Sequence, residues 1–335
     1  MIDTMSSDAT QSLAVELRLL VDAGRPDEAL AKAESLTEAE LREAPEVEIE
    51  MARALARTGH FDRATARATT ALWSARVRRD LRSQMRANLI LGGIAFEQGH
   101  PHAAEHHFGI VRVLATSLDD RQVLQKVTNN LSLLALQRQD FEAAEALLQA
   151  ALRLAEELAD IRAQAEVLHN LNITSRNLGQ FEAGTRAAKR ATQLAEHLND
   201  WSMVAMALGG LVETSLWLDA NDGLDALIDR AIECARRAGD PVREATSGRI
   251  RAVLALKRKN LTAAYEQAEA ARQLALENQA DLLAAECTAI MAVAKKRAHG
   301  EATAASLRQE ATTQLDRHRA FLETEWFERE WGAPV

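Results

Sequence analysis

Four of the nine histidines of this chain lie between His100 and His107. Within that segment His102, Glu105 and His106 form the pattern H-x-x-E-H, which is the spacing found in one class of zinc peptidases. A catalytic zinc needs three protein ligands and one open position, and the sequence after His107 offers no identifiable third ligand. We therefore interpret the segment as a solvated histidine patch at the start of a helix, with a surface zinc or nickel site as the alternative. No cofactor is expected.

Common signatures of enzyme chemistry are missing from the sequence. It contains no GxxxxGK[ST] phosphate loop, no GxGxxG dinucleotide motif and no GxSxG nucleophile motif. The glycine pairs at 92–93 and 209–210 lie within expected helices, where close packing explains them better than phosphate binding. The sequence therefore predicts that this protein is not an enzyme.

Composition predicts an all-α protein of the cytoplasm. Hydrophobic residues make up 47% of the chain but aromatic residues only 4%, which favours helices over strands. The net charge of −9 argues against nonspecific binding to nucleic acid or to acidic membranes. Cys234 and Cys287 are isolated, and neither a signal peptide nor a membrane span is recognisable. We therefore expect free thiols and a cytoplasmic location.

A repeat of 40 residues organises the chain. One column of turn residues recurs at this spacing: Gly59, Gly99, Gln139, Gly179, Asp219, Lys259 and His299. A second column holds Asp80, Asp120, Asp160, Asp200 and Asp240. Aspartate caps helices because its carboxylate accepts hydrogen bonds from the first free amides. Each repeat is thus predicted to hold a helix A of roughly 16 residues, a tight turn, a longer helix B and an Asp-capped restart.

The columns of small residues and glycines resemble those of tetratricopeptide repeats, whose usual unit is about 34 residues long. The segments 129–158 and 169–198 are similar to the long repeats of kinesin light chains, bacterial quorum-peptide receptors and the sensor arrays of some transcription activators. This resemblance implies an all-α, right-handed α-solenoid, or superhelix, of about eight helix pairs and a C-terminal capping helix.

The expected domain organisation follows the repeats. A polar N-terminal segment, 1–9, precedes the superhelix, 10–320, and a C-terminal cap or tail, 321–335, follows it. The units are expected near 10–42, 43–79, 80–119, 120–159, 160–199, 200–239, 240–279 and 280–320. Trp326 and Trp331 are expected to help cap the last repeat. An exposed docking tail is the alternative.

The resemblance also implies that helix A of each unit lines a concave groove. Counting back from the turn column gives candidate ligand contacts: Arg86, Lys126, Asn129, Asn130, His169, Asn170, Asn177, Trp217 and Arg249. Asn130 and Asn170 match the column whose asparagine, in peptide-binding members of the family, hydrogen-bonds the peptide backbone; one carboxamide both donates and accepts. Arg86, Lys126 and Arg249 could bind acidic side chains or a free carboxylate. In the alternative interpretation the asparagines only bond neighbouring helices.

These features favour a non-enzymatic scaffold, adaptor or regulator that binds a protein or peptide segment inside the groove. The cations of the groove make an acidic segment one candidate ligand. No direct contact with nucleic acid or membrane is expected. Two alternatives stay open. The chain could be an enzyme or a subunit of an enzyme complex that binds a small molecule in the groove, or a structural assembly protein that uses its convex face and C-terminal helix.

Overall fold

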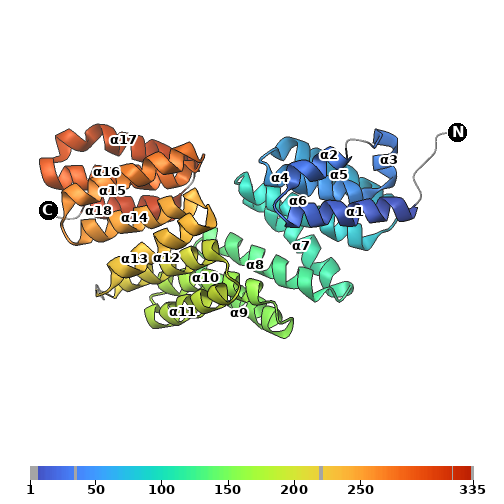
Figure 1. Ribbon diagram of the computed structural model, residues 1–335, viewed down its shortest axis with the longest axis horizontal. Coiled ribbons are helices and arrows are strands. Elements are labelled where there is room, and N and C mark those ends of the chain that lie inside the picture. The colour runs from blue at the N-terminus through green and yellow to red at the C-terminus, as the bar shows by residue number, and fades with distance from the viewer. Residues whose placement is uncertain (1–6, 34–35, 219–221, 319, 333–335) are drawn as a thin grey trace. The chain divides into compact units, whose positions relative to one another are not determined.

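A computed structural model describes residues 7–33, 36–218, 222–318 and 320–332, and every regular element within these ranges is a helix. The chain divides into two compact units, Met1–Leu158 and Ala159–Val335, and each is described by itself. The first unit contains α1 (Ser7–Asp22), α2 (Pro26–Ala33), α3 (Glu38–Glu43), α4 (Pro45–Arg57), α5 (Phe61–Val77), α6 (Leu81–Glu97), α7 (Pro101–Ser117), α8 (Arg121–Gln137) and α9 (Phe141–Glu157). The second contains α10 (Ile161–Asn177), α11 (Phe181–His197), α12 (Trp201–Trp217), α13 (Leu224–Ala238), α14 (Pro241–Lys257), α15 (Leu261–Glu277), α16 (Asp281–His299), α17 (Glu301–His318) and α18 (Phe321–Gly332) (Figure 1).

The length of the repeat comes from helices of equal length. α6 to α12, α14 and α15 each have 17 residues. Turns of three residues separate most of them. The expectation that helix B is longer than helix A is therefore wrong for these helices, but it holds for α4 and α5, which have 13 and 17 residues. Paired helices of equal length can bury their apolar faces against each other along their whole length.

The aspartate column caps the helices as the sequence predicts. Each of these side chains accepts a hydrogen bond from a backbone N–H in the first turn of the following helix: Asp80, Asp120, Asp160, Asp200 and Asp240. The turn column is confirmed at Gly59, Gly99 and Gly179, which have φ of 76°, 70° and 72°. Such left-handed backbone costs glycine little. Gln139 and Lys259 adopt the same conformation.

Two positions of the turn column differ from this pattern. Asp219 lies outside the described residues. His299 is the last residue of α16, and the adjacent Gly300 takes the positive φ instead, at 86°. α16 is therefore longer than α10, α12 and α14, at 19 residues.

Alanine columns form the interior between paired helices. Ala144, Ala264 and Ala304, five residues after the turn column, are fully buried. Because alanine side chains are short, the two helices of a hairpin can approach closely along these columns. In the second unit the inner helices α10, α12, α14 and α16 also contact one another in sequence, in addition to their own outer partners. They form a continuous inner layer of that unit.

Close approach explains Gly92 and Gly210, one glycine of each pair, whereas a Cβ on Gly93 would meet no atom within 4 Å. A Cβ atom on Gly92 would lie 2.5 Å from Cε1 of Phe108, and one on Gly210 would lie 2.6 Å from Oδ1 of Asn172. Both distances are too short for a methyl group, so these glycines serve packing, as predicted.

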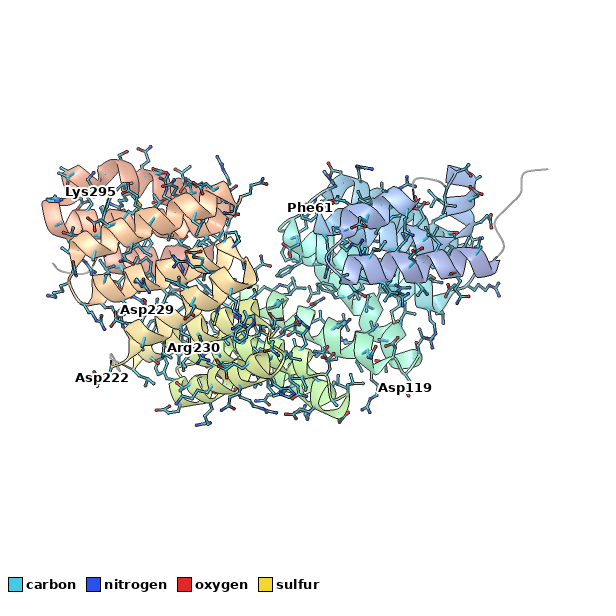
Figure 2. All side chains as sticks on the ribbon, viewed as in Figure 1. Phe61, Asp119, Asp222, Asp229, Arg230 and Lys295 are labelled. Carbon is cyan, nitrogen blue, oxygen red and sulfur yellow. The ribbon has the colours of Figure 1, made fainter. Side chains whose placement is uncertain are left out.

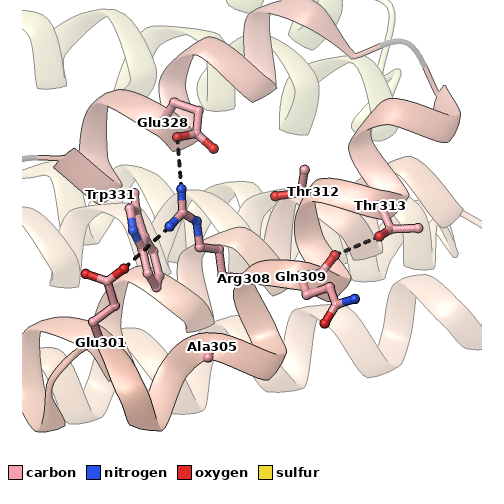
Figure 3. A pocket seen from close by; sticks show the side chains of 8 residues that line it. All are labelled: Glu301, Ala305, Arg308, Gln309, Thr312, Thr313, Glu328 and Trp331. Atoms are coloured by element: carbon pink, nitrogen blue, oxygen red, sulfur yellow. Dashed lines mark hydrogen bonds and ion pairs between the residues drawn. The ribbon is translucent and has the colours of Figure 1, made fainter.

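The last helix covers the apolar end of the second unit. Phe327 and Trp331 of α18 are 0% and 4% exposed and join the hydrophobic cluster of α16 and α17. Arg297 of α16 donates to the backbone oxygen of Glu330, 3.2 Å away. Figure 3 shows Arg308 of α17 between Glu301 and Glu328, with its guanidinium 4.8 Å from the centre of the Trp331 ring. α18 is thus a capping helix.

The outer surface carries ion pairs between neighbouring helices. Asp229 and Arg230 of α13 are labelled in Figure 2 and pair with Arg251 of α14 and Glu196 of α11. Exposed pairs of this kind contribute little to stability. Cys234 and Cys287 are buried free thiols. Within the described ranges, no helix is both long and apolar enough to cross a membrane.

Candidate functional site

A cleft of about 570 Å³ lies within the second unit, on the inner layer. Residues of α10, α12, α14 and α16 form its floor, and α18 closes one side. Its lining is mostly apolar in the middle and charged around it: Ile173, Arg176, Asn177, Glu213, Leu216, Trp217, Arg249, Ile250, Val253, Lys257, Glu286, Ala289, Ile290, Leu315, Leu322, Glu323, Trp326, Arg329 and Glu330. A few polar groups around an apolar centre are typical of ligand sites.

A diagonal row of alternating charges crosses the floor of the cleft. Arg176 of α10 pairs with Glu213 of α12 at 2.9 Å. Glu213 also pairs with Arg249 of α14, whose Nε lies 2.9 Å from Oε2 of Glu286 on α16. Each residue follows the last by 36 or 37 positions, about one helical turn less than a full repeat. The repeat spacing therefore produces the diagonal.

The two carboxylates of this row differ in how far the neighbouring arginines offset the cost of their burial. Burial alone would raise the pKa of Glu213, but Arg176 and Arg249 outweigh it and lower the pKa to about 2. Both arginines donate hydrogen bonds to this carboxylate. Glu213 is therefore a fixed anion that orients two guanidinium groups.

Glu286 lacks such support. The Nε–H of Arg249 is close to this carboxylate but makes no hydrogen bond. Burial raises the pKa of Glu286 to about 7; Arg249 opposes the shift, and the nearby Glu323 and Glu213 carboxylates add to it. Glu286 thus titrates near neutral pH at the edge of an apolar cleft, which is a property of functional sites.

Cations and an aromatic pair mark the opposite edge, where α10, α12 and α14 end. Trp217 is 50% exposed and stacks on Phe181 with ring centres 6.1 Å apart. The guanidinium of Arg329 lies over the Trp217 ring, 5.0 Å from its centre. Lys257 donates to the backbone oxygen of Leu216. This edge presents positive charge beside a large aromatic surface.

The cleft brings together only some of the residues that the sequence singles out. Asn177, Trp217 and Arg249 line it. His169 and Asn170 lie on α10 but outside the cleft lining. The remaining candidates belong to the first unit: Arg86 on α6, and Lys126, Asn129 and Asn130 on α8. For these residues a role in ligand binding stays a prediction.

His169 and its neighbour Asn172 take part in packing between α10 and α12. Asn172 is fully buried, and its Nδ2 donates to Gly184 O at 3.0 Å and to Thr214 Oγ1 at 2.6 Å. Nδ1 of His169 has no hydrogen-bond partner among the described residues. Burial and, second, the Arg243 cation lower the pKa of His169 to about 4. The imidazole is neutral at pH 7.

Arg86 belongs to a separate cluster in the first unit. Glu50 of α4 is fully buried and pairs with Arg18, Arg53 and Arg86. Burial lowers the pKa of Arg86, and Glu50 opposes this shift. An arginine that compensates a buried carboxylate is part of the fold as well as a candidate ligand contact.

The histidine segment forms the start of α7. His102, Glu105 and His106 are exposed. The Glu105 carboxylate receives two hydrogen bonds from Arg138, directly after α8, at 2.9 and 2.7 Å. Nδ1 of His107 lies 2.9 Å from Oδ1 of Asn88. No group of three or more His, Cys, Asp or Glu side chains within the described ranges is arranged to hold a metal ion.

Several charged residues of the cleft do not appear among the sequence-based candidates: Arg176, Glu213, Glu286, Glu323 and Arg329. A signal for Glu286 is present in the sequence. It occupies the same column as Arg86 and Lys126, one of those from which candidates were taken. The residues of α18 lie beyond the last repeat, so no column identifies them.

The stacked hairpins define a helical-repeat protein, and comparison with solved structures gives its type. No protein-family model matches the sequence, and no curated protein matches it. The apo quorum sensor NprR from B. thuringiensis is similar with a TM-score of 0.71 at 10% identity, covering 91% of this chain and 87% of NprR. The Rap conjugation gene regulator of plasmid pLS20, in complex with the Phr* peptide, is similar with a TM-score of 0.63 at 13% identity, covering 87% and 77%.

A third similar structure is a signal-transduction ATPase of the STAND class with a tetratricopeptide-repeat sensor, from Pyrococcus horikoshii. Its TM-score is 0.66 at 14% identity, covering 95% of this chain. This chain spans about half of that longer protein, 48%. The fold is therefore that of tetratricopeptide-repeat arrays, as the repeat columns predict. Identities this low establish the fold and not the function.

Proposed function

We propose that this chain is a non-enzymatic cytoplasmic regulator or adaptor that binds a peptide in the cleft of its second unit. The cleft carries the proposal, because it combines an apolar centre with oriented charges on rigid helices. Its volume of about 570 Å³ falls within the usual range of ligand sites, roughly 300–1,000 Å³. A short peptide segment of a few residues suits this space.

Two further observations support the proposal. The pLS20 Rap regulator, which shares the fold, was solved with a peptide. In addition, the lining of the cleft contains no Ser, Thr, Cys or His side chain, so it lacks the Ser–His and Cys–His pairs that many hydrolases use. Both favour binding over catalysis. Asn170, in the same unit as the cleft, remains a proposed backbone clamp, and the clamp role of Asn130 stays a separate proposal for the first unit.

Filling the cleft should abolish binding without disturbing the rest of the chain. Val253 lines the cleft and is partly buried, so Val253→Trp places an indole in the space a ligand would use. The same substitution at Val113, which is 67% exposed on α7 of the first unit, is the matched control. A synthetic pool that combines random tripeptides with free ends and random decapeptides blocked at both ends serves as the probe for affinity selection and mass spectrometry.

The wild type and Val113→Trp should enrich the same peptides, and Val253→Trp should not. Ile173→Trp, at another lining position, repeats the test if Val253→Trp lacks the helical circular dichroism of the wild type. Equal enrichment by cleft-filled and control proteins, or enrichment by none of them, would overturn the proposal.

A further inference from the structure

One edge of the cleft carries more carboxylates than the nearby guanidinium groups neutralise. Glu323 of α18 lines the cleft and is ion-paired with no other residue that the structure describes. Among the described residues, Glu286 has one ion-pair partner, Arg249, which it shares with Glu213. Because Glu213 is also paired with Arg176, two guanidinium groups are present for the three carboxylates Glu213, Glu286 and Glu323. This edge can accept a cation from outside the protein.

The opposite edge carries cations without carboxylate partners of good geometry. Lys257 is bonded to a backbone oxygen. Arg329 lies over Trp217, and its Nε is 3.9 Å from Oε1 of Glu330, the limit of an ion pair. Glu330 is itself engaged by Arg297 at 2.9 Å. Lys257 and Arg329 can therefore bind an anion from outside the protein.

The distance between the two edges follows from α18. Glu323 and Arg329 are six residues apart on this helix, which corresponds to about 9 Å along its axis. Trp326, halfway between them, lines the apolar middle together with Ile250 and Ile290. An extended chain spans about 3.3–3.6 Å per residue, so three residues cover the interval between the two edges.

We infer that the cleft is selective for a free, zwitterionic peptide of about three residues, with its ammonium group at Glu286 and Glu323 and its carboxylate at Lys257 and Arg329. This inference rests on the proposed function, and it adds that the ligand is a short molecule with both ends free rather than an internal segment of a protein. α18 supplies one charged group at each edge and so determines the length that fits.

The test uses tripeptides whose only charges are at their ends. A pool with Ala, Leu or Phe at each position is prepared in free, N-acetylated, C-amidated and doubly blocked forms. Binding to the full chain is measured by equilibrium dialysis with mass spectrometry. Glu323→Gln and Lys257→Gln each remove one end charge, and Glu325→Gln and Lys295→Gln are controls at positions outside the cleft.

The free pool should bind at least about tenfold more tightly than either singly blocked pool, since each block removes a charge-assisted hydrogen bond. Glu323→Gln should bind the free and the acetylated pools equally well and still prefer the free pool to the amidated one. Lys257→Gln should bind the free and the amidated pools equally well and still prefer the free pool to the acetylated one. Equal binding of all four pools to the wild type would overturn the inference. Binding of blocked decapeptides that Val253→Trp abolishes, without binding of tripeptides, would overturn the inference and leave the proposed function standing. Absence of both would overturn both.

Discussion

The guanidinium of Arg329 on α18 lies over the indole ring of Trp217 on α12, 5.0 Å from its centre. The two residues are 112 positions apart in sequence, and they connect the capping helix to the inner layer of the second unit. α18 therefore does more than cover the end of the last hairpin. It forms one side of the cleft, and its stability determines whether the cleft keeps its shape.

Trp217→Ala should loosen α18. A cation–π contact at an exposed site contributes about 0.5–1 kcal/mol, so amide hydrogens of α18 should exchange about two- to fivefold faster. Arg329→Gln should have the same effect. Trp73→Ala, at a tryptophan that is 64% exposed in the first unit, is the control. Unchanged exchange in α18 of both variants would show that the contact does not hold the helix.

Gly210→Ala should destabilise the second unit. The added methyl group would lie 2.6 Å from Oδ1 of Asn172, and Asn172 cannot turn away without losing its bonds to Gly184 and Thr214. The cost should be about 1–3 kcal/mol, larger than the gain in helix propensity of about 1 kcal/mol.

Gly93→Ala is the matched control for this substitution. A Cβ at Gly93 meets no atom within 4 Å, so this variant should gain up to about 1 kcal/mol from helix propensity alone. Thermal unfolding followed by circular dichroism distinguishes the two. Two variants that melt at or above the temperature of the wild type would contradict the packing role of Gly210.

Glu286→Gln should change the dependence of stability on pH. The folded chain raises the pKa of Glu286 to about 7, above the ordinary value, so between those values the folded state holds a proton that the unfolded state has released. The wild type therefore loses stability from this carboxyl as the pH rises toward 7 and little more above it, by up to about 3 kcal/mol. Glutamine has no such loss.

The melting temperature of Glu286→Gln, relative to the wild type, should accordingly rise between pH 5 and pH 8. Glu325→Gln, at an exposed position of α18, should show a flat difference over this range. His169 acts in the opposite direction in both proteins, because its lowered pKa removes stability as the pH falls below 6. The contribution of His169 to the pH dependence of stability therefore cancels when the wild type and Glu286→Gln are compared. A flat difference for Glu286→Gln would contradict the account of this carboxyl.

Chelation of divalent metals should leave thermal stability unchanged. The Glu105 carboxylate is engaged by Arg138, and exposed histidine pairs bind metal too weakly to support a fold. Melting with and without a chelator, combined with elemental analysis of the purified protein, checks this. Stoichiometric zinc together with a lower melting temperature after chelation would contradict the interpretation of the histidine patch.

The repeat spacing made the fold predictable, because each structural feature of a hairpin recurs in a fixed column. The Asp80 column gave the helix starts and the Gly59 column gave the turns. The same columns identified Asn177, Trp217 and Arg249 within the cleft. They could not separate these residues from Lys126 or Asn130, because equivalent columns occur in both units and only the arrangement of the helices forms a cleft.

The charges of the cleft were harder to predict than its helices. Glu286 looks like any other acidic residue of an acidic chain until its burial and its shared partner are known. Glu323 and Arg329 follow no repeat column, and their position depends on how Phe327 and Trp331 anchor α18. Sequence periodicity predicts which face of a helix is buried. It does not predict which charged residues, 36 or 37 positions apart, form ion pairs between neighbouring helices.

The most direct test of the central claim is amide hydrogen exchange of the full chain with and without a peptide enriched by the wild-type protein. We predict slower exchange in α12, α14, α16 and α18 on addition of the peptide, with no change in residues 7–157 and no change anywhere in Val253→Trp. Protection confined to the first unit, or protection that persists in Val253→Trp, would contradict the claim that the cleft of the second unit is the ligand-binding site.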